Sequence, residues 1–315
     1  MKKILLITIL LILFSTIISA QDAEITPEAT EDPISTVSIE PIYSVEGDSV
    51  ILDVYFNTLK QGRAGLLGLQ GDNITSASAS IFNDTIEFFE IEGREGWWAF
   101  ISASIGQTIR QYDLPVTIML EGTSEPQVLL TRFNIISGGF ISQAVNLIPD
   151  DELARLLDPA VETTEFERIF TVASEISDEV YWNTNSFIAP LTTELTSPFG
   201  ASRIFNEELE TTHTGWDFNA PTGLPLLSTA SGKVAFAGTM DIRGNYVLVN
   251  HGQGVYSGYA HMSVIYVTQG QDVSEGQVLG LVGTTGRSSS AHAHFEMIVN
   301  GQWVDAVDFL RMYVP

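Results

Sequence analysis

The sequence predicts a mostly β protein: an N-terminal Ig-like β-sandwich, a short helical connector and a C-terminal antiparallel-β domain. Three observations indicate this architecture. Residues 36–140 contain short alternating apolar runs separated by Gly, Asn and Asp, residues 149–177 change to a helical period, and the chain from residue 188 is glycine-rich with brief apolar runs. Alternation with period two between turn residues is typical of antiparallel strands, whereas apolar residues three and four positions apart are typical of helices.

The first 35 residues predict export. Residues 1–20 have two lysines, an apolar run over 4–18 and then small residues, which is the layout of a secretory signal peptide cleaved after Ala20. The alternative is a retained anchor, but a bilayer span needs about 20 apolar residues. We therefore expect no stable membrane insertion after cleavage and a location in the periplasm, the cell wall or outside the cell. Residues 21–35 are acidic and rich in Thr, Ala and Pro, and predict a solvated linker.

The composition excludes several classes of function. The chain has 14 Lys and Arg against 39 Asp and Glu. Because an acidic surface repels phosphate backbones, we expect no nucleic-acid partner. The chain has no cysteine, which excludes a disulfide framework in an exported protein and lipid attachment to a cysteine. The sequence indicates no particular oligomeric state.

The β-sandwich is predicted over residues 36–140. Six runs have strand character and are separated by turn residues at the spacing of a sandwich: 49–56, 64–69, 85–91, 97–103, 114–120 and 128–135. Trp97 and Trp98 are adjacent in one of these runs. They could stack on sugar rings, but strand aromatics more often fill a core, which is the interpretation we favour. We expect this domain to position or space the C-terminal domain.

The connector is predicted over residues 141–187, ahead of a second β domain at 188–315. A first helix is expected from Pro149, because "PDDELARLLDP" has Pro and acidic residues in its first turn. A second is expected over 163–177. There, one face is apolar and comprises Phe166, Ile169, Phe170 and Ala173.

The five histidines of the chain all lie between residues 213 and 294. His292 and His294 form an H-x-H pair, and on a strand both would point to the same face. His213 and Asp217 stand four positions apart around a glycine, so both side chains could reach one ion. Two imidazoles and one carboxylate leave the fourth position of a catalytic zinc open. Each histidine alone could be structural, but their clustering in one β region favours a metal site.

Residues 197–297 resemble the catalytic domain of the M23 metallopeptidases, the lysostaphin-like or LytM-like zinc endopeptidases. The segments "HTGWD", "GYAHM" and "HAH" occur in the family's order, and the resemblance covers roughly the last 120 residues. It implies a LytM-like fold with a duplicated hybrid motif and one zinc ion per chain. It also implies a hydrolase that cuts peptide bonds in peptidoglycan stems or cross-bridges, with zinc-bound water as the nucleophile.

The same resemblance implies a role for each site residue. His213, Asp217 and His294 would be the zinc ligands. His292 would be the general base, and His261 would hydrogen-bond the developing oxyanion or help to hold the water. The family has Gly-Pro-His-Leu-His where this chain has Ser-Ala-His-Ala-His at 290–294. This departure changes the groove around the site but removes no ligand.

Two other functions are compatible with parts of the sequence. The first is a catalytically silent LytM-like module that binds cell wall or activates an amidase. Such modules typically lack some ligands, whereas all five positions are filled here. The second is a biotinyl- or lipoyl-like carrier barrel, which needs a lysine on a hairpin. The only lysine in this domain, Lys233, lies in a predicted strand, which argues against a carrier. His251, in the "NHGQG" turn, is expected to be structural.

Overall fold

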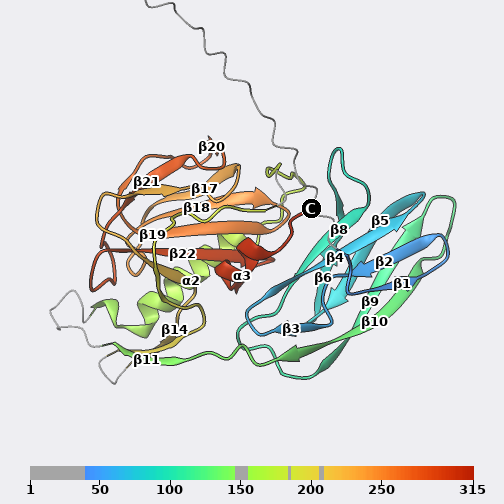
Figure 1. Cartoon of the computed structure of the whole chain (residues 1–315), viewed down its shortest axis with the longest axis horizontal. Helices are drawn as coiled ribbons and strands as arrows, with labels where there is room; N and C mark the ends of the chain where they lie inside the picture. The colour runs from blue at the N-terminus through green and yellow to red at the C-terminus, as the bar shows by residue number, and fades with distance from the viewer. Residues whose placement is uncertain (1–39, 146–154, 184–185, 206–208) are drawn as a thin grey trace, which may run out of the picture. The chain divides into compact units, whose positions relative to one another are not determined.

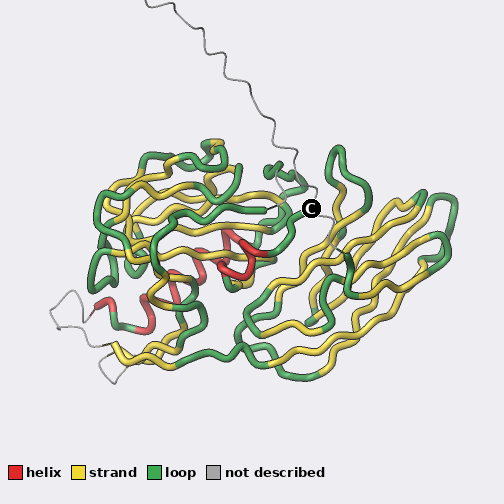
Figure 2. Tube along the Cα trace, viewed as in Figure 1, coloured by secondary structure: helices red, strands yellow, loops and turns green. Residues whose placement is uncertain are grey.

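The computed structural model describes residues 40–145, 155–183, 186–205 and 209–315. The predicted signal peptide and linker, and most of the first predicted connector helix, lie outside these ranges. No helix among the described residues is long and apolar enough to cross a membrane. Strand dominates the described chain, and its helices all follow residue 145 (Figure 2). The prediction of a mostly β protein is therefore confirmed.

Residues 43–136 form two five-stranded sheets (Figure 1). The first has the order β1 (Tyr43–Glu46), β2 (Val50–Val54), β4 (Ala64–Gly71), β8 (Trp97–Ser102) and β7 (Phe89–Glu90). The second has the order β3 (Thr58–Lys60), β10 (Gln127–Ile136), β9 (Gln111–Leu120), β5 (Ile74–Ile81) and β6 (Asp84–Glu87). Five of the six predicted runs each contain one strand. The run predicted over 85–91 is instead divided into β6 and β7, which belong to different sheets. The strands β1, β3 and β5 were not predicted.

The two sheets share one apolar core, to which alternate residues of each strand contribute. In β10, Leu129, Phe133 and Ile135 are buried while Val128 and Leu130 are exposed. Residues of β2, β4, β5, β8 and β9 complete this cluster. The alternation that predicted the strands therefore also selects their buried face.

Trp97 and Trp98 point to opposite faces of the first sheet because they are successive residues of β8. Trp97 packs against the core between the two sheets. Trp98 packs with Tyr55 and Tyr313, at ring-centroid distances of 6.1 and 6.3 Å. Both indoles are partly buried, which agrees with a packing role for the pair.

The connector contains a strand as well as a helix. β11 (Ser142–Val145) pairs in parallel with β13 (Ser202–Phe205), which pairs with β14 (Leu209–Thr212). The helix α2 (Pro159–Ala173) begins after Asp158, whose Oδ1 accepts a hydrogen bond from the Ala160 amide at 2.9 Å. This capping contact and the proline in the first turn explain where the helix begins. Ile169 is buried as predicted, but Phe170 is half exposed.

The C-terminal domain is a large sheet of antiparallel strand pairs, as predicted. Its order is β12 (Leu195–Ser197), β15 (Trp216–Asn219), β22 (His292–Val299), β19 (Val255–Ile265), β18 (Asn245–Gly252), β17 (Gly232–Thr239) and β20 (Asp272–Val273). Further strands are added by β16 (Pro225–Leu227), β21 (Val278–Val282) and β23 (Gln302–Val304), and the helix α3 (Ala306–Arg311) follows.

The two faces of β22 have different environments. Ala293, Phe295 and alternate residues beyond them point into the largest apolar core of the protein. Ile298, on the opposite face, packs in a second cluster with Ile169 of α2. Because His294 alternates with Ala293, it shares the α2-covered face.

The sandwich and the C-terminal domain have a common core. Phe100 of β8 packs with Trp182 and Phe309, at ring-centroid distances of 6.2 and 6.1 Å. The Asn300 side chain donates a hydrogen bond to the Phe100 carbonyl at 2.7 Å. Residues 39–315 accordingly form one compact unit, and the predicted domain bounds stay a prediction.

Candidate metal centre

The register of two neighbouring strands places the first two site residues. In the antiparallel pair β15 and β22, Asp217 stands opposite His294 and Asn219 stands opposite His292. Both histidines are on one strand face because they are two positions apart. The sheet therefore presents one carboxylate and two imidazoles on the same side.

The third site residue comes from the turn that follows β14. The His213 amide donates to the Ala201 carbonyl at 2.9 Å, and the His213 carbonyl accepts from the Gly200 amide at 2.8 Å. The next glycine, Gly215, has no room for a side chain, since an added Cβ would lie 2.3 Å from the Phe295 carbonyl oxygen. The glycine of the H-x-G-x-D segment therefore allows this turn to approach β22 closely.

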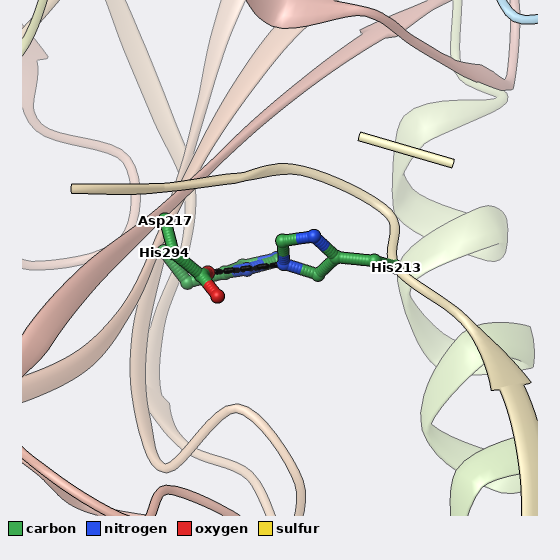
Figure 3. Close-up of side chains that lie close together, drawn as sticks. All are labelled: His213, Asp217 and His294. Atoms are coloured by element: carbon green, nitrogen blue, oxygen red, sulfur yellow. Dashed lines mark hydrogen bonds and ion pairs between the residues drawn. The ribbon is translucent and has the colours of Figure 1, made fainter. Parts of the chain in front are cut away.

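Three side-chain atoms converge at this place (Figure 3). The distances are 3.0 Å between His213 Nε2 and Asp217 Oδ1, 2.9 Å between His213 Nε2 and His294 Nδ1, and 2.9 Å between His294 Nδ1 and Asp217 Oδ1. All three residues are buried, and their ligand atoms lie close enough to hold one metal ion.

The outer ring nitrogens of the two histidines show which atoms carry protons. His213 Nδ1 lies 2.8 Å from the Pro198 carbonyl oxygen, and His294 Nε2 lies 3.2 Å from Glu296 Oε1. Both partners can only accept a hydrogen bond, so these outer nitrogens are the N–H groups of the neutral rings. In the neutral rings, the inward nitrogens His213 Nε2 and His294 Nδ1 carry the lone pairs that a metal ion would use. Three atoms that carry lone pairs and lie about 3 Å apart can coordinate one cation.

Burial and neighbouring charges both shift the pKa values of the site residues. Burial favours a neutral Asp217, but His213 and His294 outweigh burial and hold the pKa of its carboxyl well below the usual range. Burial lowers the pKa of His213 to about 4. Burial would also lower the pKa of His294, but the carboxylates of Asp217 and Glu296 together raise it. Arg203 forms an ion pair with Asp217 Oδ2, which leaves Oδ1 facing the histidines.

His292 lies beside these three residues with one nitrogen unpaired. Its Nδ1 donates to the Ser290 carbonyl at 2.8 Å. Its Nε2 is buried, has no hydrogen-bond partner among the described residues and lies 3.7 Å from Asp217 Oδ1. Burial lowers the pKa of His292, so the ring is neutral near pH 7 and its unpaired Nε2 can accept a proton.

His261 reaches the same place through an unusual backbone conformation. Its φ of 59° lies in the left-handed region, which is strained for a residue with a side chain. The rings of His261 and His292 have centroids 4.7 Å apart. His261 Nδ1 donates to the Thr285 carbonyl at 2.8 Å, and burial followed by His292 holds the pKa of His261 well below its usual range. Its Nε2 is therefore also an acceptor.

The cavity around the site is small and includes residues that sequence reasoning missed. It has a volume of about 130 Å³ and is lined by the site histidines together with Glu162, Phe166, Arg203, Arg243 and Arg287. Glu296 was also missed, although the alternation that paired His292 with His294 places it on the same face. Arg243 lies on a loop and Glu162 lies on α2. No sequence pattern identified either residue as part of the site.

His251 lies outside the cluster. Its Nδ1 is 2.8 Å from the Ser231 carbonyl oxygen and its Nε2 is 2.7 Å from Ser257 Oγ. It is fully buried and packs edge-on against Phe187, with ring centroids 5.0 Å apart. These contacts are those of a structural histidine.

The fold and the donor set define an antiparallel-β domain in which a His-Asp-His group able to hold a metal ion lies against one sheet face. Residues 211–306 match the model of Peptidase family M23. The chain therefore carries a Peptidase family M23 domain.

Two bacterial proteins with named enzymatic activities are similar in sequence to this domain. The chain is 41% identical over 121 residues to the DD-carboxypeptidase/endopeptidase Mpg of Neisseria meningitidis serogroup B, covering 38% of this chain and 28% of the relative. It is 42% identical over 95 residues to the peptidoglycan DD-endopeptidase ShyA of Vibrio cholerae serotype O1, covering 30% of this chain and 22% of the relative. The matches thus span under a third of the length of these relatives.

One solved structure resembles more of the chain. It is a candidate M23 peptidase from Pseudomonas aeruginosa, with 25% sequence identity and a TM-score of 0.58. The likeness covers 79% of this chain and 94% of that chain. It therefore extends well beyond the residues matched by the family model.

Proposed function

We propose that this chain is an exported zinc metalloendopeptidase that hydrolyses peptide bonds in peptidoglycan stems or cross-bridges. The observation that carries the proposal is the convergence of three lone-pair atoms, from His213, Asp217 and His294, beside the unpaired Nε2 of His292. The Peptidase family M23 match supports a peptidase. The names of the relatives Mpg and ShyA support peptidoglycan as the substrate class.

Zinc fits the donor set of this site. Two imidazole nitrogens and one carboxylate oxygen are common ligands of catalytic zinc and leave one position for water or substrate. One ion per chain would be held by His213, Asp217 and His294. When bound, zinc supplies Lewis acidity, which makes water easier to deprotonate and polarises a peptide carbonyl. The outer N–H groups of both histidines are already paired, which orients their free nitrogens toward the ion.

His292 would carry the proton during hydrolysis. Because its Nδ1 donates to the Ser290 carbonyl, the ring is fixed with Nε2 toward the metal-binding residues. Nε2 can take a proton from the attacking water and pass it to the leaving amine. A neutral ring is the form required, and burial keeps His292 neutral near pH 7.

His261 is suited to hold the water. The family resemblance implies that His261 contacts either the oxyanion or the water. Its Nδ1 donates to the Thr285 carbonyl, so in the neutral ring Nε2 can only accept a hydrogen bond. Acceptance from the attacking water is therefore the role that its geometry supports better.

The test is mass spectrometry of the fragments released from purified sacculi. The protein should comprise residues 21–315, because the C-terminal domain packs against α2 and against Phe100 of the sandwich. With one equivalent of zinc, we expect new peptide termini that also identify the bond cut. His294→Ala should abolish release together with zinc binding, whereas His292→Ala should abolish release but keep zinc.

Absence of released fragments would change the proposed function. If the folded, zinc-loaded chain released no fragments from sacculi or from soluble cross-linked muropeptides, the endopeptidase proposal would be wrong. The silent module that binds cell wall or activates an amidase would then be the better description. It would be tested by pull-down on sacculi and by amidase assays.

A further inference from the structure

The connector helix α2 contacts the metal-binding domain through a buried carboxylate. Glu165 lies outside the segment that matches the family model and is only 6% exposed. Its Oε2 accepts a hydrogen bond from the Ile242 amide at 2.7 Å. Its Oε1 accepts from the Arg243 amide at 3.1 Å and from Arg243 Nη1 at 2.9 Å. Glu165 thus fixes both the backbone and the side chain of Arg243.

Arg243 connects this helix to β22. Its Nε donates to both carboxylate oxygens of Glu296, at 3.2 and 3.0 Å, and its Nη2 donates to Glu296 Oε1 at 2.5 Å. Arg243 is 3% exposed and Glu296 is completely buried. A guanidinium binds a carboxylate in a fixed planar arrangement, so the orientation of Arg243 determines that of Glu296.

Glu296 in turn contacts a candidate metal ligand. Its Oε1 accepts a hydrogen bond from His294 Nε2 at 3.2 Å. Its Oε2 accepts from the Tyr246 hydroxyl at 2.8 Å, and the Thr214 hydroxyl donates to Oε1. With Nε2 held in this way, the ring of His294 is turned so that Nδ1 faces Asp217. An outer carboxylate of this kind fixes both the tautomer and the orientation of a metal-binding histidine.

This series of contacts contains more negative than positive charge. One arginine lies between two glutamates, so the positive charge of Arg243 is shared between Glu165 and Glu296. If Glu165 were neutral, Arg243 would fully compensate Glu296, and the pull of Glu296 on the His294 N–H would weaken. Since all three groups are buried, water cannot substitute for a lost partner.

We propose that Glu165 is a positioning residue of the metal centre, acting through Arg243 and Glu296 to hold His294 Nδ1 toward the ion. The inference rests on the zinc site proposed above. It makes the connector helix part of the metal centre, although the helix contributes no ligand. Glu165 and Arg243 therefore act on the same metal ligand, although they are 78 positions apart in the sequence.

The experiment compares zinc affinity in residues 21–315 of the wild-type chain and of Glu165→Gln, measured by competition with a chromophoric chelator. Loss of the direct outer partner of a metal-binding histidine typically weakens affinity by about 10- to 100-fold. Because Glu165 acts through Arg243 and Glu296, we expect a loss at the lower end of that range, about tenfold. The visible absorption of the Co²⁺-substituted variant should also change. A purely structural role would lower the thermal midpoint of the metal-free chain but leave zinc affinity and the Co²⁺ spectrum unchanged.

Glu167→Gln is the matched control. Glu167 is on the same helix and is exposed. It is two positions from Glu165 and therefore lies on a different face of the helix. The substitution removes the same charge from α2 but leaves the buried contacts of Arg243 in place, so zinc affinity should stay at the wild-type value.

Four results would overturn or redirect the proposal. Wild-type affinity in a folded Glu165→Gln variant would overturn it, as would equal losses in Glu165→Gln and Glu167→Gln. If Glu165→Gln does not fold, Arg243→Lys decides instead, because it keeps the buried charge but lacks the planar guanidinium that orients both carboxylates. Wild-type affinity in that variant would also overturn the proposal. Failure of the wild-type chain to bind zinc would instead refute the proposed function.

Discussion

Asp217 and His294 stand opposite each other on β15 and β22, with 2.9 Å between Oδ1 and Nδ1. They are 77 positions apart in the sequence, and their distance is set by the hydrogen-bonded register of two antiparallel strands. Sites on paired strands are held more rigidly than sites on loops. The remaining member, His213, lies on a turn and depends on the close approach of that turn to β22.

Gly215→Ala should disrupt the metal centre without removing a ligand. The added Cβ would lie 2.3 Å from the Phe295 carbonyl oxygen, so the turn that carries His213 must move away from β22. Overpacking of this kind costs about 1–3 kcal/mol of stability. Zinc affinity should fall by at least about tenfold, as measured by chelator competition.

The matched control for that substitution is Gly106→Ala. An added Cβ at Gly106 meets nothing within 4 Å, so both stability and zinc affinity should match wild type. Equal zinc affinity in the Gly215 and Gly106 variants would show that the close approach of the turn is unnecessary for the site.

His292→Gln should separate metal binding from hydrolysis. His292 Nε2 is buried and unpaired, and glutamine cannot accept and return a proton in its place. Loss of a general base typically lowers kcat by about 10²–10⁴-fold. Steady-state hydrolysis of a cross-linked muropeptide would measure this loss, and zinc content after gel filtration should stay at the wild-type level. A variant that keeps most of the wild-type rate would exclude His292 as the base.

Local patterns predicted much of this structure. Alternation predicted six runs that contain seven strands of the sandwich, although it did not separate β6 from β7. The same rule placed His292 and His294 on one face of β22. The strand β5 escaped prediction because its inward residues include Ala77 and Ala79, which contrast little with the serines between them. Strands with small side chains carry a weak apolar signal.

Tertiary contacts account for what local patterns could not predict. Alternation places His261 on the face opposite Ala260, but its left-handed φ of 59° turns the ring toward His292. The contact between Glu165 and Arg243 joins positions 78 apart, on a helix and a loop, and no sequence period links them. Glu296 could have been identified, since it follows His294 at the strand period of two.

Stability should fall with acid partly through His251. Burial lowers its pKa from 6.5 to about 4, so between these values the unfolded chain binds a proton that the folded chain does not. The stabilisation is therefore complete above about pH 6.5 and is lost as pH falls toward 4. Between pH 7 and pH 5 this one group should account for about 2 kcal/mol.

His251→Gln measures that contribution. Glutamine cannot titrate, so the free energy of unfolding should fall by about 2 kcal/mol less between pH 7 and pH 5 than in wild type. Urea unfolding with EDTA present removes any metal contribution. The variant is expected to be less stable than wild type at pH 7, because His251 has two hydrogen bonds. The test is therefore how the free energy of unfolding changes with pH, and not its absolute value. If this pH dependence were identical in the variant and in wild type, His251 would not be a neutral buried group.

Removal of zinc should destabilise the folded chain. In the folded chain, His213 Nε2, Asp217 Oδ1 and His294 Nδ1 already lie about 3 Å from one another, so zinc should bind the folded state and not the unfolded chain. A ligand that binds only the folded state stabilises it by about 2.7 kcal/mol at a free concentration 100 times Kd. The urea midpoint should therefore rise with buffered zinc and fall with EDTA. His294→Ala should show no such dependence, and if it responded to zinc as wild type does, the stabilising ion would be bound elsewhere on the chain.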